Sequence, residues 1–267
     1  MIESYSALAS VYDDVMGHVD YDRWARYVHQ CIQTHARALR GEAGETRPLS
    51  VLELGGGTGS LACRLQPLGG YRYVLTDGSP AMLKEARRKI AEQTSGVSAA
   101  QVTCAQATFP EVDAPEVMQH APYDAIVLVY DGLNYLTDPG DISSCFARVH
   151  ELLQTGGIAV IDHSTPSNSK DHAAEFTDRG TVNGVSYVRH NRYDEAKDLH
   201  YTTFHIVRGG RQEREEHVQR PYSIEEVEAC VQESPLHDVA AYSGFTFDSA
   251  DARSYRVHWV LERASGE

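Results

Sequence analysis

The stretch "ELGGGTG" at residues 53–59 and the acidic residue Asp77 form the pattern with the clearest chemical meaning. Four glycines in five positions allow positive φ angles and carry no Cβ, so a ligand can lie directly against the main chain. A helix that follows such a loop also points its free N–H groups at the ligand. An acidic side chain at the end of the next strand can accept hydrogen bonds from both hydroxyls of a ribose. These residues therefore indicate a nucleoside-containing cofactor.

Three other interpretations of the same residues remain open at this point. The glycines can form a plain turn between a strand and a helix. Asp77 can serve only as a cap for the helix that Ser79 and Pro80 begin. The segment "GTGSLA" at residues 57–62 fits the G-x-G-x-x-A pattern of NAD-binding loops.

The surrounding segments alternate between strand and helix patterns. We expect strands at 49–54, 71–76, 98–104, 123–130 and 157–162, and helices from about 59, at 80–93 and at 140–153. Apolar spacing before the first strand predicts two helices within residues 3–40, with a break near 17–21. Such alternation is typical of a parallel sheet that is covered by helices on both faces.

The pattern changes in the last third of the chain. Residues 180–220 show no helical period, and turn-like "DEAKD" and "RGGR" separate short alternating runs, which predicts an antiparallel sheet of three or four strands. Ser223 and Glu226 form a capping box that opens a helix over 223–233. Two final strands are expected around 238–247 and 255–262.

The composition of the chain restricts the classes of molecule that it is expected to bind. The chain has 267 residues and a formal net charge of −14, which disfavours nucleic acid and anionic membranes and favours a small molecule. Five cysteines without a C-x-x-C pair predict neither a disulfide framework nor a zinc ribbon, and no H-E-x-x-H motif signals a metal site. No apolar run is long enough to span a membrane, and no signal peptide is recognisable, so we expect a cytoplasmic protein without a metal.

The segments "LELGGGTG" and "LTDGSPAMLKEAR" together resemble the motifs of the class I S-adenosylmethionine-dependent methyltransferases. "YDAIVLVYDGLNYL" and "LLQTGGIAVID" resemble the later strands of that family, so the resemblance covers about residues 45–165. It implies an α/β fold of the Rossmann-like, doubly wound type, with a mostly parallel seven-stranded sheet. The implied organisation is an N-terminal helical cap at 1–44, a core at 45–165 and 223–267, and an antiparallel insertion at 166–222.

The resemblance also implies S-adenosylmethionine as the cofactor and S-adenosylhomocysteine as the product. Glu53 would lie near the ammonium group, Asp77 would hold the ribose hydroxyls, and the carbonyl oxygen of Gln106 would accept the adenine amino group. The tyrosine-rich N-terminal segment resembles that of a bacterial subgroup in which it folds over the cofactor. The implied cofactor contacts are Tyr12, Glu53, Gly55, Gly56, Gly57, Thr58, Gly59, Asp77, Gly78, Ser79, Met82, Gln106, Ala107, Tyr130 and Asp131.

The insertion resembles the substrate lid of the nucleotide-sugar N,N-dimethyltransferases and, more loosely, glycine N-methyltransferase. Methyl transfer from a sulfonium is an in-line displacement that mainly needs positioning and a dry site. An oxygen or amine nucleophile can also need a general base, for which His163 and His217 are the candidates. The expected substrate contacts are Asn134, Tyr135, Arg220 and Tyr222.

The predicted function is therefore methyl transfer to nitrogen or oxygen of a small polar acceptor. The alternatives are a methyltransferase that acts on RNA or protein, a non-catalytic module that binds S-adenosylmethionine, and an NAD-dependent oxidoreductase. A homodimer is compatible with the sequence, which names neither the acceptor nor the oligomeric state.

Overall fold

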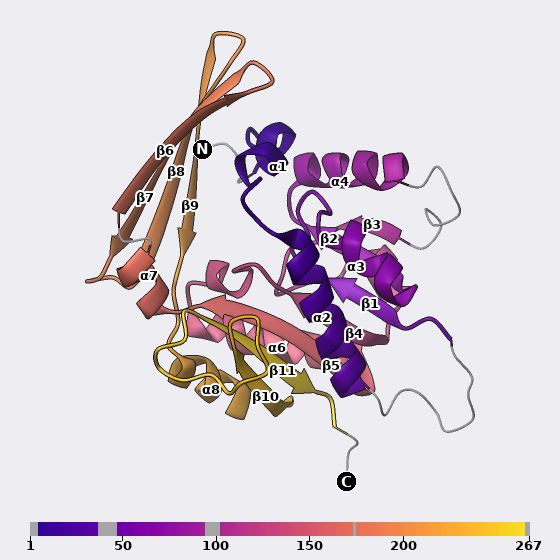
Figure 1. The fold of residues 1–267 in the computed structure, drawn as a ribbon. Coiled ribbons are helices and arrows are strands. Elements are labelled where there is room, and N and C mark those ends of the chain that lie inside the picture. Colours follow the sequence, from indigo (N-terminus) through magenta and orange to yellow (C-terminus); the bar gives the residue numbers. More distant parts are fainter. Residues whose placement is uncertain (1–4, 37–46, 94–101, 173–174, 265–267) are drawn as a thin grey trace.

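A seven-stranded sheet forms the centre of the computed structural model, which describes residues 5–36, 47–93, 102–172 and 175–264 (Figure 1). Its strand order is β10-β11-β5-β4-β1-β2-β3, and β11 alone runs antiparallel to its neighbours. The doubly wound, mostly parallel fold expected from the sequence is confirmed. The strands are β1 (Ser50–Glu53), β2 (Arg72–Asp77), β3 (Val102–Gln106), β4 (Tyr123–Leu128), β5 (Leu153–Ser164), β10 (His237–Ser243) and β11 (Arg256–Glu262).

Helices cover both faces of this sheet because alternate residues of each buried strand are apolar on opposite sides. On β1, Val51 packs into the cluster beneath one helical layer and Leu52 into the cluster beneath the other. The first layer contains α2 (Tyr21–His35), α3 (Ala62–Gly69) and α4 (Pro80–Gln93). The second contains α5 (Pro115–Met118), α6 (Pro139–Leu152) and α8 (Ile224–Gln232), and the predicted capping box of Ser223 and Glu226 opens α8.

The chain leaves this core after β5 through α7 (Pro166–His172) and forms a second sheet. The four antiparallel strands β6 (Glu175–Val182), β7 (Val185–Asp194), β8 (Leu199–Arg208) and β9 (Arg211–Gln219) are neighbours in sequence order. This insertion sheet, which the sequence predicted as antiparallel, leans away from the main sheet on the side of α1 (Figure 1). The chain returns to the core at α8.

The N-terminal segment lies between the insertion sheet and the glycine loop. It contains the short helices η1 (Ala9–Val11) and α1 (Tyr12–Val15). Leu8 and Val11 share a buried cluster with Phe204 of β8. On the other side, Asp13 accepts a hydrogen bond from Thr58 at 2.6 Å and pairs with Lys89 at 2.6 Å. The segment therefore connects the two sheets on the side where the glycines lie.

Several element bounds differ from the sequence-based expectation. Strand β5 begins at Leu153 because that residue pairs with Tyr123 of β4, and β10 ends at Ser243 before a turn. The short elements α5, α7 and η4 (Leu133–Tyr135) were not predicted, since one or two helical turns leave little periodicity. Residues 37–46, at the end of the second predicted helix, and 98–101, at the start of the strand predicted at 98–104, lie outside the described ranges. Within those ranges no helix is long and apolar enough to cross a membrane.

Candidate active site

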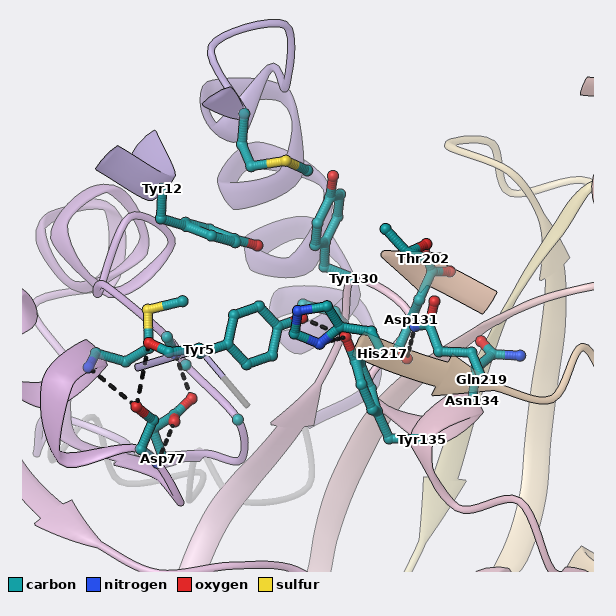
Figure 2. Close-up of a pocket in the computed structure, with 18 of the residues that line it drawn as sticks. Tyr5, Tyr12, Asp77, Tyr130, Asp131, Asn134, Tyr135, Thr202, His217 and Gln219 are labelled. Carbon is teal, nitrogen blue, oxygen red and sulfur yellow. Dashed lines mark hydrogen bonds between the residues drawn. The ribbon is translucent and has the colours of Figure 1, made fainter. Parts of the chain in front are cut away.

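A cavity of about 590 Å³ opens at the carboxyl ends of β1, β2 and β4. It is bounded on one side by the glycine loop and on the other by the insertion sheet, and residues of the N-terminal segment line it between the two. Figure 2 shows Asp77 at one end and Thr202 and Gln219 toward the other, with Tyr5 and His217 between them. The strand order reverses next to β1, where open α/β sheets bind their ligands. The volume suits a cofactor together with a small second molecule.

The glycine loop borders the cavity with bare backbone. Gly55 and Gly57 line the cavity at φ angles of +65° and +56°, and a Cβ on Gly57 would meet nothing within 4 Å. Gly56 is needed for packing, since a Cβ there would lie 2.7 Å from Cγ of Leu75. Gly59 does not line the cavity and instead allows α4 to approach, with Cβ of Ala86 3.2 Å from the position of a Cβ at this residue.

Asp77 holds this loop in place. Its Oδ2 accepts the N–H of Gly57 at 2.9 Å, and its Oδ1 accepts the N–H of Ser79 at 2.8 Å. Burial raises the pKa of the Asp77 carboxyl, and these two hydrogen bonds only partly oppose that effect. Ser79, not Asp77, caps α4, because its hydroxyl accepts the N–H of Met82 at 3.4 Å. Asp77 is therefore not the cap of this helix, and its carboxyl instead connects the glycine loop to the start of α4.

Glu53 is a buried carboxyl at the end of β1. It is 4% exposed and accepts a hydrogen bond from the hydroxyl of Tyr73 at 2.9 Å. Burial raises the pKa of Glu53 to about 8, with a smaller contribution from the charge of Asp77. The site thus favours a cation near Glu53, because a positive charge would stabilise the ionised form.

Aromatic rings separate the two ends of the cavity. The ring of Tyr5 lies 4.3 Å from that of His217 and 5.7 Å from that of Tyr12, measured between centroids. The hydroxyls of Tyr5 and Tyr135 are hydrogen-bonded to each other. Burial raises the pKa of Tyr5 well above its ordinary value, so this ring stays neutral at physiological pH. The four rings present both apolar faces and hydroxyl groups to a ligand.

Two strained residues follow β4 at the edge of the cavity. Tyr130 and Asp131 have φ angles of +68° and +62°, which non-glycine residues rarely adopt. Arg256 of β11 donates to Asp131 at 2.7 Å and also pairs with the fully buried Asp162. Its guanidinium lies 5.2 Å from the ring centroid of Trp24. These contacts stabilise the strained backbone conformation at this position and hold the Asp131 carboxylate in place.

Most of the residues expected from the sequence line the cavity, and six do not. The lining set includes Tyr12, Glu53, Gly55, Gly56, Gly57, Thr58, Asp77, Gly78, Ser79, Met82, Tyr130, Asp131, Asn134, Tyr135 and His217. The six outside it are Gly59, Gln106, Ala107, His163, Arg220 and Tyr222.

The position of His163 corrects its expected role as a base. The residue is fully buried, and its Nδ1 accepts a hydrogen bond from the indole of Trp259 at 3.3 Å. Burial lowers the pKa of His163 to about 3, and the charge of Arg256 adds to this effect. The side chain packs within the sheet instead of pointing into the cavity, so the structure offers no support for a catalytic His163.

Arg220, Tyr222 and Gln106, which also lie outside the cavity, make contacts with neighbouring residues instead. Arg220 pairs with Glu226 at 2.8 Å, and the buried hydroxyl of Tyr222 donates to the carbonyl of Leu136. Gln106 is exposed, and its amide donates to the carbonyl of Gly78 at 3.3 Å. Two of the four expected substrate contacts, Arg220 and Tyr222, are thus used to join the insertion to the core.

One face of the insertion sheet supplies lining residues that sequence reasoning missed. Alternate residues in one part of β7, β8 and β9 line the cavity, and this alternation was the available signal. The sequence does not give the register between these strands, however, so it could not show which face of the insertion sheet turns toward the cavity. The missed residues are Arg189, Asn191, His200, Thr202, Phe204 and Gln219. Among the residues that the structure describes, no three His, Cys, Asp or Glu side chains are grouped as metal ligands.

Comparisons with known proteins agree with this geometry. Residues 51–157 match the family described as "Methyltransferase domain". The chain is 26% identical over 266 residues to the putative methyltransferase YqeM of Bacillus subtilis (strain 168), with 97% of each chain covered.

Solved structures share the fold. An S-adenosylmethionine-dependent methyltransferase from Clostridium acetobutylicum superimposes with a TM-score of 0.74 at 21% identity, over 98% of this chain and 99% of that one. The amino pentose methyltransferase CalS10 from Micromonospora echinaspora, solved with S-adenosylmethionine bound, gives a TM-score of 0.67 at 17% identity, over 95% and 97% of the two chains.

Proposed function

We propose that the chain is an S-adenosylmethionine-dependent methyltransferase and that it methylates nitrogen or oxygen of a small polar acceptor. The observation that carries this proposal is the continuity of one cavity. The glycine loop and two carboxylates stand at its core end, and a row of polar side chains stands at its insertion-sheet end. A donor and an acceptor can thus occupy the same enclosed space.

The core end fits the cofactor. Gly57 leaves open space for a ligand against the backbone, Gly55 also lines the cavity, and Glu53 offers its carboxyl group to an ammonium group. Asp77 would accept hydrogen bonds from ribose hydroxyls, and Tyr12 would contribute an aromatic face to the positive sulfonium. When bound, S-adenosylmethionine supplies an activated methyl group on that sulfonium.

The remaining work of the protein is to orient the acceptor, exclude water and remove a proton. We assign the last task to His217, which is 3% exposed and lies in the cavity wall. Its Nε2 lies 3.7 Å from the carboxylate of Glu215, which favours a proton on that nitrogen. Nδ1 then remains available as the proton acceptor, and it lies 3.4 Å from the hydroxyl of Tyr135.

A small acceptor is favoured over a macromolecule. The rings of Tyr5 and Tyr135 and the insertion sheet enclose the place where the acceptor would bind. The net charge of −14 opposes RNA binding. The fold neighbour CalS10, described as an amino pentose methyltransferase, also supports an acceptor of this size.

Calorimetric titration with S-adenosylmethionine and S-adenosylhomocysteine tests the cofactor site. We expect Asp77→Ala to weaken both by tenfold or more, about 1.4 kcal/mol. Asp113→Ala is the control, because Asp113 is exposed and does not line the cavity. Binding that Asp77→Ala leaves unchanged would remove the proposed contact. Binding without formation of S-adenosylhomocysteine from any small amine or alcohol in a screen would favour the non-catalytic alternative.

A further inference from the structure

The cavity is electrically polarised. Three acidic side chains, Glu53, Asp77 and Asp131, line its core side, and Asp131 is paired there with Arg256. On the insertion-sheet side Arg189 is present, and among the described residues that line the cavity it is the only arginine or lysine. A cationic cofactor is attracted to the first side, whereas a negative group would be repelled there and attracted to the second.

Arg189 is held in a fixed orientation within β7. One nitrogen of its guanidinium donates to Asp178 on the neighbouring strand β6 at 2.7 Å, and the group lies 4.8 Å from the ring centroid of Phe176. The side chain is 12% exposed. Its Nε is buried, and no hydrogen-bond partner for it is found among the described residues. The guanidinium is therefore preorganised but incompletely satisfied.

Polar neighbours continue the same face across the sheet. Asn191 is two residues beyond Arg189 and also lines the cavity, and its buried Oδ1 has no hydrogen-bond partner in the part of the chain that the structure describes. Thr202 is the cross-strand neighbour of Asn191, and His217 is the cross-strand neighbour of Thr202. This row leads from Arg189 to the residue that we assign as the base.

The charge of Arg189 also acts on Tyr130, another residue that lines the cavity. Burial raises the pKa of Tyr130 at the end of β4, and the charge of Arg189 is one of the two influences that oppose this increase.

We propose that Arg189 binds an anionic group of the acceptor, a carboxylate or a phosphate. This inference rests on the proposed function and narrows its substrate class to acidic small molecules. A planar guanidinium matches both groups, and an anion would satisfy the buried Nε. Asp178 occupies one terminal nitrogen of the guanidinium, and the other terminal nitrogen makes only a 3.8 Å contact with the sulfur of Met16, a weak acceptor that an anion can replace.

The test titrates acetate and inorganic phosphate, separately and at low ionic strength, into the protein saturated with S-adenosylhomocysteine. The wild type should bind one of the anions saturably, and Arg189→Gln should weaken that binding at least tenfold. Arg192→Gln is the matched control, since this arginine of β7 points to the opposite face and its side chain is 58% exposed. Stronger binding of acetate would indicate a carboxylate, and stronger binding of phosphate a phosphoryl group.

Arg189→Lys keeps the positive charge but loses the planar guanidinium, so this variant should bind the anion with intermediate affinity. It replaces Arg189→Gln in the test if the glutamine variant does not fold. Equal anion binding by wild type and Arg189→Gln, or no saturable binding of either anion, would overturn the inference. Failure of the protein to bind S-adenosylhomocysteine would instead contradict the proposed function. The anion titration of the unloaded protein would then still report on Arg189.

Discussion

The buried carboxylate of Glu215 on β9 accepts the backbone N–H of Leu8 at 3.2 Å, and it also accepts that of Ala7. Its other oxygen faces His217. Glu215 is 1% exposed, so this contact between the N-terminal segment and the insertion sheet is shielded from water. The residue thus closes the cavity wall and orients the proposed base at the same time.

Glu215→Ala should destabilise the protein by about 1–3 kcal/mol, because two buried N–H groups lose their acceptor. Amide hydrogen exchange at residues 7 and 8 should become faster, and S-adenosylhomocysteine should dissociate faster. Urea unfolding and exchange followed by mass spectrometry measure these effects. Glu216→Ala is the control, since its exposed ion pair with Arg214 contributes little.

The stabilisation by Glu215 should depend on pH. Burial would raise the pKa of Glu215, but the nearby imidazole of His217 and the hydrogen bonds from the backbone of Ala7 and Leu8 together lower it below its ordinary value. A lowered folded-state pKa means that the stabilisation is complete above the unfolded-state pKa and is lost as the pH falls through the folded-state value. Glu215→Gln should therefore show a smaller loss of unfolding free energy between pH 6 and pH 3. Parallel curves for wild type and variant would contradict this account.

Cofactor binding should release a proton from Glu53. With a pKa of about 8, its carboxyl is mostly protonated at pH 7, and an ammonium group placed beside it would favour ionisation. Calorimetric enthalpies for S-adenosylhomocysteine at pH 7 should then vary with the ionisation enthalpy of the buffer. Glu53→Gln should bind more weakly and show a smaller buffer dependence. An unchanged dependence in the variant would place the ammonium group elsewhere.

Arg256→Leu should destabilise the protein by about 3–5 kcal/mol, because Asp131 and the buried Asp162 lose their shared cation. Burial raises the pKa of Asp162 to about 7 even with Arg256 present, and without it the value should rise further. A raised pKa means that the ionised form of Asp162 is destabilised in the folded protein. The loss of unfolding free energy caused by Arg256→Leu should therefore be larger at pH 8, where Asp162 would be ionised, than at pH 5. Urea unfolding of wild type and variant at the two pH values measures this difference in unfolding free energy. Arg253→Leu, at an exposed pair with Asp251, should change little.

The sequence by itself determined the order of the strands and the longer helices, the glycine loop and the carboxyl groups at the ends of β1 and β2. These features are local: the glycines, Asp77 and the capping box of Ser223 and Glu226 act through the backbone of their own or the adjacent segment. Short-range periodicity and spacing therefore suffice to find them.

The tertiary structure alone decided which side chains meet. The register of β7 with β8, and of β8 with β9, turns Arg189, Thr202 and His217 toward the cavity. A strand shifted by one residue would turn its side chain to the opposite face of the sheet. Packing of β11 against β5 brings Arg256 to Asp162 and buries His163 beside Trp259. Such pairs are distant in sequence, and only the assembled sheets bring them together.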